Sequence, residues 1–131
     1  MIRIPIRGFL GLLALGWGLA AGGLAAQEFE ANFATGIYAY QQGEYTTAYQ
    51  HLAPLAGKGH SSAQYNLGLM YANGEGVAQD VVEAYKWFFL AHKNGRKEGE
   101  QAMLSLAPLL SKAQIKEAID RARNECCALK R

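Results

Sequence analysis

Apolar side chains recur along this chain at the spacing of α-helices. Three stretches place one every three or four residues, which is the period of a single helix face. Their members are Ala63, Leu67 and Tyr71; then Ala84, Phe88 and Ala91; then Ile115, Ile119, Ala122 and Cys126. No stretch after residue 28 alternates apolar and polar residues between turn pairs, as a half-buried strand would. The pattern therefore predicts an all-α chain.

Start and stop signals divide this pattern into helices. Three capping boxes, in which a Ser or Asp is followed three residues later by Gln or Glu, indicate helix starts. They are Ser61 with Gln64, Asp80 with Glu83, and Ser111 with Gln114. Glycines indicate the ends, and the predicted helices are 29–41, 44–56, 61–72, 80–93, 97–107 and 111–128. Short connections between them predict successive antiparallel hairpins.

The hairpins contain an internal repeat. Tyr40 and Gly43 recur as Tyr71 and Gly74, 31 residues later, whereas Gly59 recurs as Gly95 after 36 residues. The second copy therefore has five extra residues between its helices, around 76–80. A two-helix unit of this length is typical of tetratricopeptide-type α-solenoids.

The segment 63–102 resembles a Sel-1-like repeat, a relative of the tetratricopeptide repeat. The matching residues are Ala63, Leu67, Gly68, Tyr71, Gly74, Gly76, Val77, Asp80, Ala84, Trp87, Ala91, Gly95 and Ala102. Residues 30–62 resemble a degenerate repeat, residues 63–98 a full one, and residues 99–128 the capping helices that close such arrays. The resemblance implies a short solenoid that binds proteins or peptides, without catalysis of its own.

Five repeat-defining residues have an expected structural role. Gly68 should let its helix approach a neighbour closely, and Gly74 and Gly76 should supply backbone with positive φ. We expect Asp80 to cap the following helix. Trp87 should fill the space between hairpins.

The first 26 residues are typical of a secretory signal peptide. Arg3 and Arg7 precede a run of 19 uncharged residues that ends in small side chains, with cleavage expected after Ala25 or Ala26. The alternative is an uncleaved inner-membrane anchor, since such a run can just span a bilayer. No second run of this length follows, so we expect residues 27–131 to form one repeat domain outside the membrane. The predicted location is the bacterial periplasm or the medium.

Charge argues against nucleic acid as a partner. The formal charge of +2 rests on Arg3 and Arg7, and the rest of the chain carries 11 basic and 11 acidic side chains. A nucleic-acid-binding face needs an excess of basic residues.

The residues also give little support to an enzyme. His51, His60 and His92 have no Cys, His or carboxylate at helical i+3 or i+4 spacing, so neither a metal nor another cofactor is predicted. The Gly74–Gly76 segment lacks the Gly-Lys-Ser/Thr ending of a phosphate-binding loop, and no serine lies in a GxSxG motif. An envelope hydrolase acting on β-lactams or cell-wall peptides, with Ser61 as its test residue, is the least favoured alternative.

The two cysteines are adjacent and cannot join distant helices. Cys126 continues the apolar stripe of the last helix and is expected to be buried. Cys127 lies about 100° around the helix and is the expected exposed thiol, available for an intermolecular disulfide.

The predicted function is a non-catalytic scaffold or adaptor for an unknown protein or peptide in the cell envelope. First helices of successive hairpins should line a concave groove. The residues left over from the core on helix 61–72 are Asn66, Met70 and Asn73, and Thr35 and Tyr38 are weaker additions. The alternatives are that these side chains are merely solvated, or that the open ends of the array form a homo-oligomer.

Overall fold

The computed structural model describes the backbone of residues 20–128 and the side chains of residues 23–126. Its helices are α1 (Ala20–Gln41), α2 (Tyr45–Gly57), α3 (Ser61–Asn73), α4 (Val81–Lys93), α5 (Glu98–Leu106), the short 3₁₀ helix η2 (Ala107–Leu109) and α6 (Lys112–Ala128). No strand occurs in this part of the chain, so the all-α prediction is confirmed. Most of the predicted signal peptide, residues 1–19, lies outside the described residues.

The predicted helix boundaries agree with the structure except at the first helix. Helices α2 to α6 each begin within one residue of the predicted start. The exception is α1, which begins at Ala20 instead of residue 29 and continues through Gly22 and Gly23.

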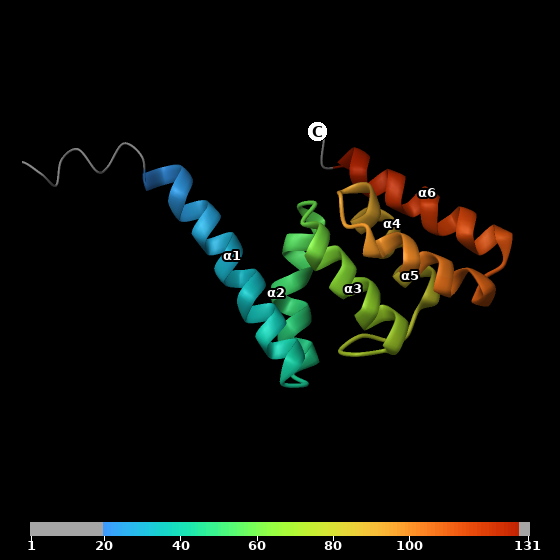
Figure 1. The fold of residues 1–131 in the computed structure, drawn as a ribbon, viewed down its shortest axis with the longest axis horizontal. Coiled ribbons are helices and arrows are strands. Elements are labelled where there is room, and N and C mark those ends of the chain that lie inside the picture. Colours follow the sequence, from blue (N-terminus) through green and yellow to red (C-terminus); the bar gives the residue numbers. More distant parts are fainter. Residues whose placement is uncertain (1–19, 129–131) are drawn as a thin grey trace, which may run out of the picture. The chain divides into compact units, whose positions relative to one another are not determined.

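The chain forms two compact units, residues 1–31 and residues 32–131, and α1 crosses the boundary between them. In the first unit the described part is helical and exposes Leu24. In the second unit, α3 contacts α2 and α4, and α4 also contacts α5 and α6 (Figure 1). Helix α4 is therefore the central helix, and its Ala84, Phe88 and Ala91 are at most 2% exposed.

In each of the first two hairpins, a glycine of the first helix lies under a side chain of the second helix. A Cβ added at Gly36 would lie 2.8 Å from Cγ of Leu52, and one added at Gly68 would lie 2.5 Å from Cε1 of Phe88. Leu52 and Phe88 are both buried. The close approach predicted for Gly68 is thus confirmed, and a second one occurs at Gly36.

Backbone hydrogen bonds reproduce the two offsets of the sequence repeat. The amide of Glu44 donates to Ala39 O at 2.9 Å, and 31 residues later the amide of Glu75 donates to Met70 O at 2.9 Å. The amide of His60 donates to Leu55 O, and 36 residues later that of Arg96 donates to Ala91 O. Each donating amide directly follows a glycine with positive φ, and the bond closes the helix that ends just before that glycine. These glycines are Gly43, Gly59, Gly74 and Gly95.

Of the three predicted capping boxes, the one at Ser111 is complete. At Asp80 only the cap itself forms, because the Asp80 amide donates to Tyr71 O and not to the Glu83 side chain. Asp80 Oδ1 accepts from the amide of Glu83 at 3.0 Å. Ser111 Oγ accepts from the amide of Gln114 at 3.2 Å, and the Gln114 side chain accepts from the amide of Ser111 at 2.9 Å.

The predicted cap at Ser61 is wrong. The N-cap is His60, whose Nδ1 accepts from the amide of Ala63 at 3.0 Å. Gln64 is 2% exposed; its amide donates to Ala56 O at 3.0 Å and its oxygen accepts from Asn94 at 2.9 Å. The Gln64 side chain therefore makes long-range hydrogen bonds and is not available for a capping box with Ser61.

The long loop between α3 and α4 packs against the start of α2. Gly74 and Gly76 have φ values of 71° and 73°, as predicted. A Cβ at Gly76 would lie 2.7 Å from the carbonyl oxygen of Tyr45, so only glycine fits there. Beside it, the Tyr40 hydroxyl donates to Glu75 Oε2 at 2.6 Å.

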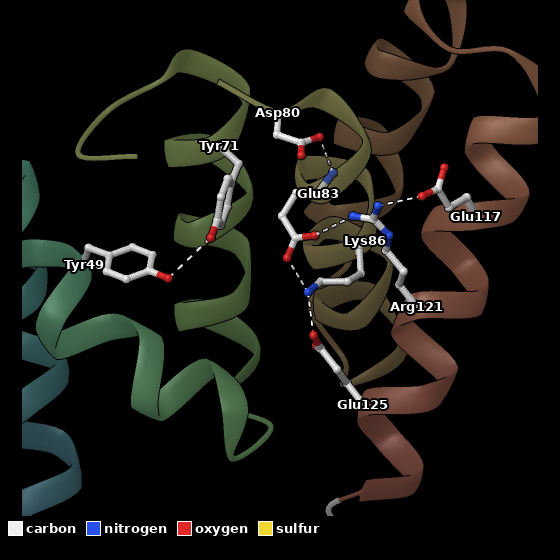
Figure 2. A network of polar contacts seen from close by, with 8 residues as sticks. All are labelled: Tyr49, Tyr71, Asp80, Glu83, Lys86, Glu117, Arg121 and Glu125. Atoms are coloured by element: carbon white, nitrogen blue, oxygen red, sulfur yellow. Dashed lines mark hydrogen bonds and ion pairs between the residues drawn. The ribbon is translucent and has the colours of Figure 1, made fainter. Parts of the chain in front are cut away.

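Helix α6 packs on α4 through small side chains and a buried charge. Ala118 and Ala122 are fully buried. Next to them Lys86, only 3% exposed, forms ion pairs with Glu83 and with Glu125 (Figure 2). The carboxylates compensate the cost of burying the ammonium group.

Cys126 is exposed, so its predicted burial is wrong. It follows Ala122 by one helical turn, but at this end of α6 it lines an open cavity. The side chain of Cys127 lies outside the described residues, and its predicted exposure stays a prediction.

Candidate functional site

A cleft of about 400 Å³ lies between α3 and α5, the first helices of successive hairpins. Phe88 of α4 also lines it. The lining residues are Tyr65, Leu69, Ala72, Phe88, Glu98, Gln101, Ala102, Ser105 and Leu106. Helix α3 contributes an aromatic and an aliphatic side chain, whereas α5 contributes most of the polar ones.

The aromatic side of the cleft is held in place by contacts on two sides of Tyr65. The Tyr65 ring lies 5.4 Å from the Phe88 ring, between centroids, and the guanidinium carbon of Arg96 lies 4.7 Å from the Tyr65 centroid. Arg96 in turn donates to Ser62 Oγ at 2.7 Å and lies 3.6 Å from a Glu98 oxygen. A cation over an aromatic face is attractive, so Tyr65 is positioned without any ligand.

On α3, the residues that line the cleft lie one position before the residues of the predicted groove. Lining residues Tyr65, Leu69 and Ala72 each precede one of the predicted residues, which is a rotation of about 100° around the helix. Met70 is fully buried, so its predicted exposure is wrong. Its backbone oxygen accepts from the amide of Glu75, just as the oxygen of Ala39 accepts from the amide of Glu44 one repeat earlier. Ala39 is also buried. The 31-residue offset pairs Met70 with Ala39 in the sequence, but the burial of both residues follows only from the structure.

The other predicted groove residues do not line this cleft. Asn66 is half-buried and donates to Ser62 O at 2.8 Å, and Asn73 is exposed. Thr35 and Tyr38 are exposed on α1, where Tyr38 keeps 65% of its surface. Their contact with a partner stays a prediction.

The remaining repeat-defining residues form the core and its turns. Leu67, Ala84 and Ala91 are at most 1% exposed, and Trp87 is 9% exposed. Gly95 has a φ of 99°.

Tyr71 is half-buried, and its hydroxyl lies 3.3 Å from that of Tyr49 (Figure 2). Burial, followed by the hydrogen bond to Tyr49, raises the pKa of Tyr71. Burial also raises the pKa of Tyr40, and its hydrogen bond to Glu75 acts in the same direction. Both hydroxyls therefore stay protonated at pH values well above the usual pKa of a tyrosine side chain.

The described residues contain neither a metal-binding cluster nor a membrane-spanning helix. Among their side chains, no three His, Cys, Asp or Glu residues lie close enough together to bind a metal ion. Within the same residues, every helix is too short or too polar to span a bilayer.

Comparison with known proteins identifies the repeat. The family model described as "Sel1 repeat" matches residues 29–52 and 61–95. The first match covers the second half of α1 and the first part of α2, and the second covers α3, the long loop and α4.

Two curated relatives are named "Exopolysaccharide production negative regulator". The protein from Rhizobium leguminosarum bv. viciae is 35% identical over 82 residues, which is 57% of this chain and 31% of the relative. The protein from Rhizobium meliloti (strain 1021) is 33% identical over 82 residues, with the same shares. The chain thus spans about a third of the length of the relatives that it matches.

Proposed function

Since this chain is a Sel1-repeat protein, we propose that it is a non-catalytic scaffold that holds a segment of a protein partner in the cleft between α3 and α5. Sel1 repeats generally mediate protein–protein interaction. The observation that supports this site is the preorganised aromatic wall. Tyr65 is held between Phe88 and Arg96 beside a cavity that the chain leaves open. Preorganised aromatic side chains bind at a lower entropic cost than mobile ones.

The chemistry of the lining indicates the kind of segment that fits. Leu69 and Ala72 offer an apolar surface for one or two aliphatic side chains of the partner, and the buried Phe88 ring forms the base of the cleft. Gln101 and Ser105 lie one turn apart on α5 and provide polar groups on the opposite side. An amphipathic helix or an extended segment with apolar anchors meets both requirements.

We further propose a regulatory role in the cell envelope. The names of the two relatives support regulation, although the chain matches only about a third of their length. The predicted signal peptide supports the compartment, in which residues 27–131 would act outside the inner membrane. No part of the proposed mechanism requires a reaction at the cleft.

Site-specific photo-crosslinking in cells tests the cleft. A photoreactive amino acid at the position of Ala72 should form a crosslink to a partner protein, which mass spectrometry identifies. The same amino acid at Gln50, which is exposed on α2, is the matched control and should not form that crosslink. The Leu69→Arg substitution should reduce the Ala72 crosslink at least fivefold, because it places a charge on the apolar wall.

Two outcomes would count against the proposal. Equal crosslinking from Ala72 and Gln50 would mean that the cleft is not the binding surface. A crosslink only between copies of this chain would favour the self-assembling oligomer. Leu104 and Leu109 are 66% and 68% exposed and would be the first residues to substitute in that case.

A further inference from the structure

Helix α6 is attached to the repeats through a narrow apolar stripe. Its main contacts are with α4, and in its described part the fully buried side chains are those of two alanines, Ala118 and Ala122. Ile115 and Ile119 beside them are only half-buried. An alanine buries far less apolar area than a leucine, so this stripe contributes little to holding α6 on α4.

Two ion pairs next to this stripe join α6 to α4 (Figure 2). Lys86 Nζ of α4 lies 2.6 Å from Glu125 Oε1 of α6. Arg121 Nη1 of α6 lies 3.3 Å from Glu83 Oε2 of α4. The side chains of Glu125 and Arg121 are each 46% exposed, so dissolved salt can screen both pairs.

Each cation of these two pairs also has a carboxylate on its own helix. Lys86 is paired with Glu83, three residues before it on α4. Arg121 is paired with Glu117, four residues before it on α6, at 2.6 Å. Separating the helices would therefore leave both cations paired. Among the described side chains of this network only Glu125 would lose its partner, and it is exposed enough to be hydrated instead.

The usual obstacle to separating ion-paired helices is thus small at this interface. Breaking a buried ion pair is costly mainly because it leaves an uncompensated charge in the protein interior. Here the buried ammonium group of Lys86 keeps Glu83 whether α6 is docked or not.

Release of α6 would also open a cavity of about 570 Å³. Trp87 and Leu90 of α4 line it, and α6 contributes Glu125 and Cys126 to the same cavity. Trp87 and Leu90 are 9% and 3% exposed in the docked state. Removing the side that α6 provides would therefore open the cavity to solvent next to these two apolar side chains.

We infer that α6 is a releasable lid, which separates from α4 as a unit while α3 and α4 stay folded, and which the two interhelical ion pairs hold closed. Local opening of this kind has its own free energy, lower than that of global unfolding. Leu110, in extended backbone between η2 and α6, provides a place for the chain to bend. The lid contributes no residue to the α3–α5 cleft, so this inference does not depend on the function proposed above.

Hydrogen–deuterium exchange of the full-length chain, followed by mass spectrometry, tests the lid. The comparison uses amides 116–122 in the middle of α6, where fraying of the helix ends has little effect. They should exchange at least about tenfold faster than the core amides of α3 and α4. Raising NaCl from about 50 mM to about 500 mM should accelerate α6 by a further factor of about three and leave α3 unchanged.

A pair of matched substitutions tests the role of the ion pairs. Arg121→Gln removes one interhelical pair and should accelerate exchange in α6 about fivefold at low salt. Lys116→Gln is the control, because Lys116 is an exposed cation of the same helix whose partner, Asp120, also lies on α6. Both variants lose a pair within α6, but only Arg121→Gln loses a contact with α4.

Thiol labelling connects the opening of α6 with the face of α4. In a background with Cys126→Ser and Cys127→Ser, Leu90→Cys should react with a maleimide at a rate that rises with salt in parallel with α6 exchange. Ala63→Cys, at a fully buried position of α3, should show no such rise.

Three results would overturn the inference. The first is exchange in α6 at the rate of α3 and α4 at both salt concentrations, which would mean that α6 opens only when the whole domain unfolds. The second is an equal effect of Arg121→Gln and Lys116→Gln, which would mean that the interhelical pairs do not hold the lid. The third is labelling of Leu90→Cys that does not change with salt, since α6 would then not control access to this face. Loss of partner crosslinking from Ala72 would affect only the function proposed for the cleft.

Discussion

Replacing Gly68 with alanine should destabilise the protein, although alanine is the better helix former. The added Cβ would lie 2.5 Å from Cε1, 2.6 Å from Cδ1 and 2.9 Å from Cζ of Phe88. Carbon atoms prefer separations of about 3.5–4.0 Å, so the ring and the helix must separate by roughly 1 Å. Phe88 is 2% exposed, so its ring is packed on nearly all sides and can shift only toward the cleft that it lines.

The expected magnitude is the difference between two opposing effects. Overpacking a tight core costs about 1–3 kcal/mol. Replacing glycine by alanine inside a helix gains about 0.5–1 kcal/mol. The midpoints of the two ranges give a fall in the free energy of unfolding of about 1.25 kcal/mol, which corresponds to a decrease in Tm of roughly 5–10 °C for a domain of this size.

Urea unfolding followed by far-ultraviolet circular dichroism measures this change. Gly57→Ala is the matched control, because its Cβ meets nothing and its stability should be unchanged or raised by up to about 1 kcal/mol. In a Phe88→Leu background, Gly68→Ala should cost less than half as much, since the ring atoms that it meets are gone. If Gly68→Ala unfolds at the same or a higher urea concentration than the parent, the close-contact argument is refuted.

Two further predictions concern the long loop and the tyrosines. Gly76→Ala should lower the free energy of unfolding by at least twice the roughly 1 kcal/mol expected for Gly43→Ala. Both have positive φ, but only at Gly76 does the Cβ also meet a backbone carbonyl; equal losses in urea unfolding would contradict this. Stability should also fall as pH rises above about 10, since Tyr40 and Tyr71 keep their protons in the folded state, where their pKa is raised, while they ionise in the unfolded chain. The double variant Tyr40→Phe, Tyr71→Phe should show a shallower decline in urea midpoints between about pH 9 and about pH 11, and an unchanged slope would refute the assignment.

Short-range signals in the amino-acid sequence were enough to predict the helices and the repeat. Asp80 and Ser111 cap their helices as expected, and Gly74 and Gly76 adopt positive φ. These features depend on atoms within three or four residues of one another, so the local sequence contains all the interacting groups. The 31- and 36-residue offsets were likewise visible, and the backbone hydrogen bonds follow them.

The face that each helix presents was decided by residues far apart in the sequence. The predicted groove missed the cleft by one position because Phe88 of α4 covers Gly68 and Met70 is drawn into the core. Ser61 does not cap its helix, because the Gln64 side chain that a capping box at Ser61 requires accepts a hydrogen bond from Asn94, 30 residues further along the chain. Rotating a helix by 100° about its own axis leaves the spacing of its apolar residues unchanged, but different side chains are then buried against the neighbouring helices. Only the packing of neighbouring helices fixes that rotation, and with it the residues that a partner can reach.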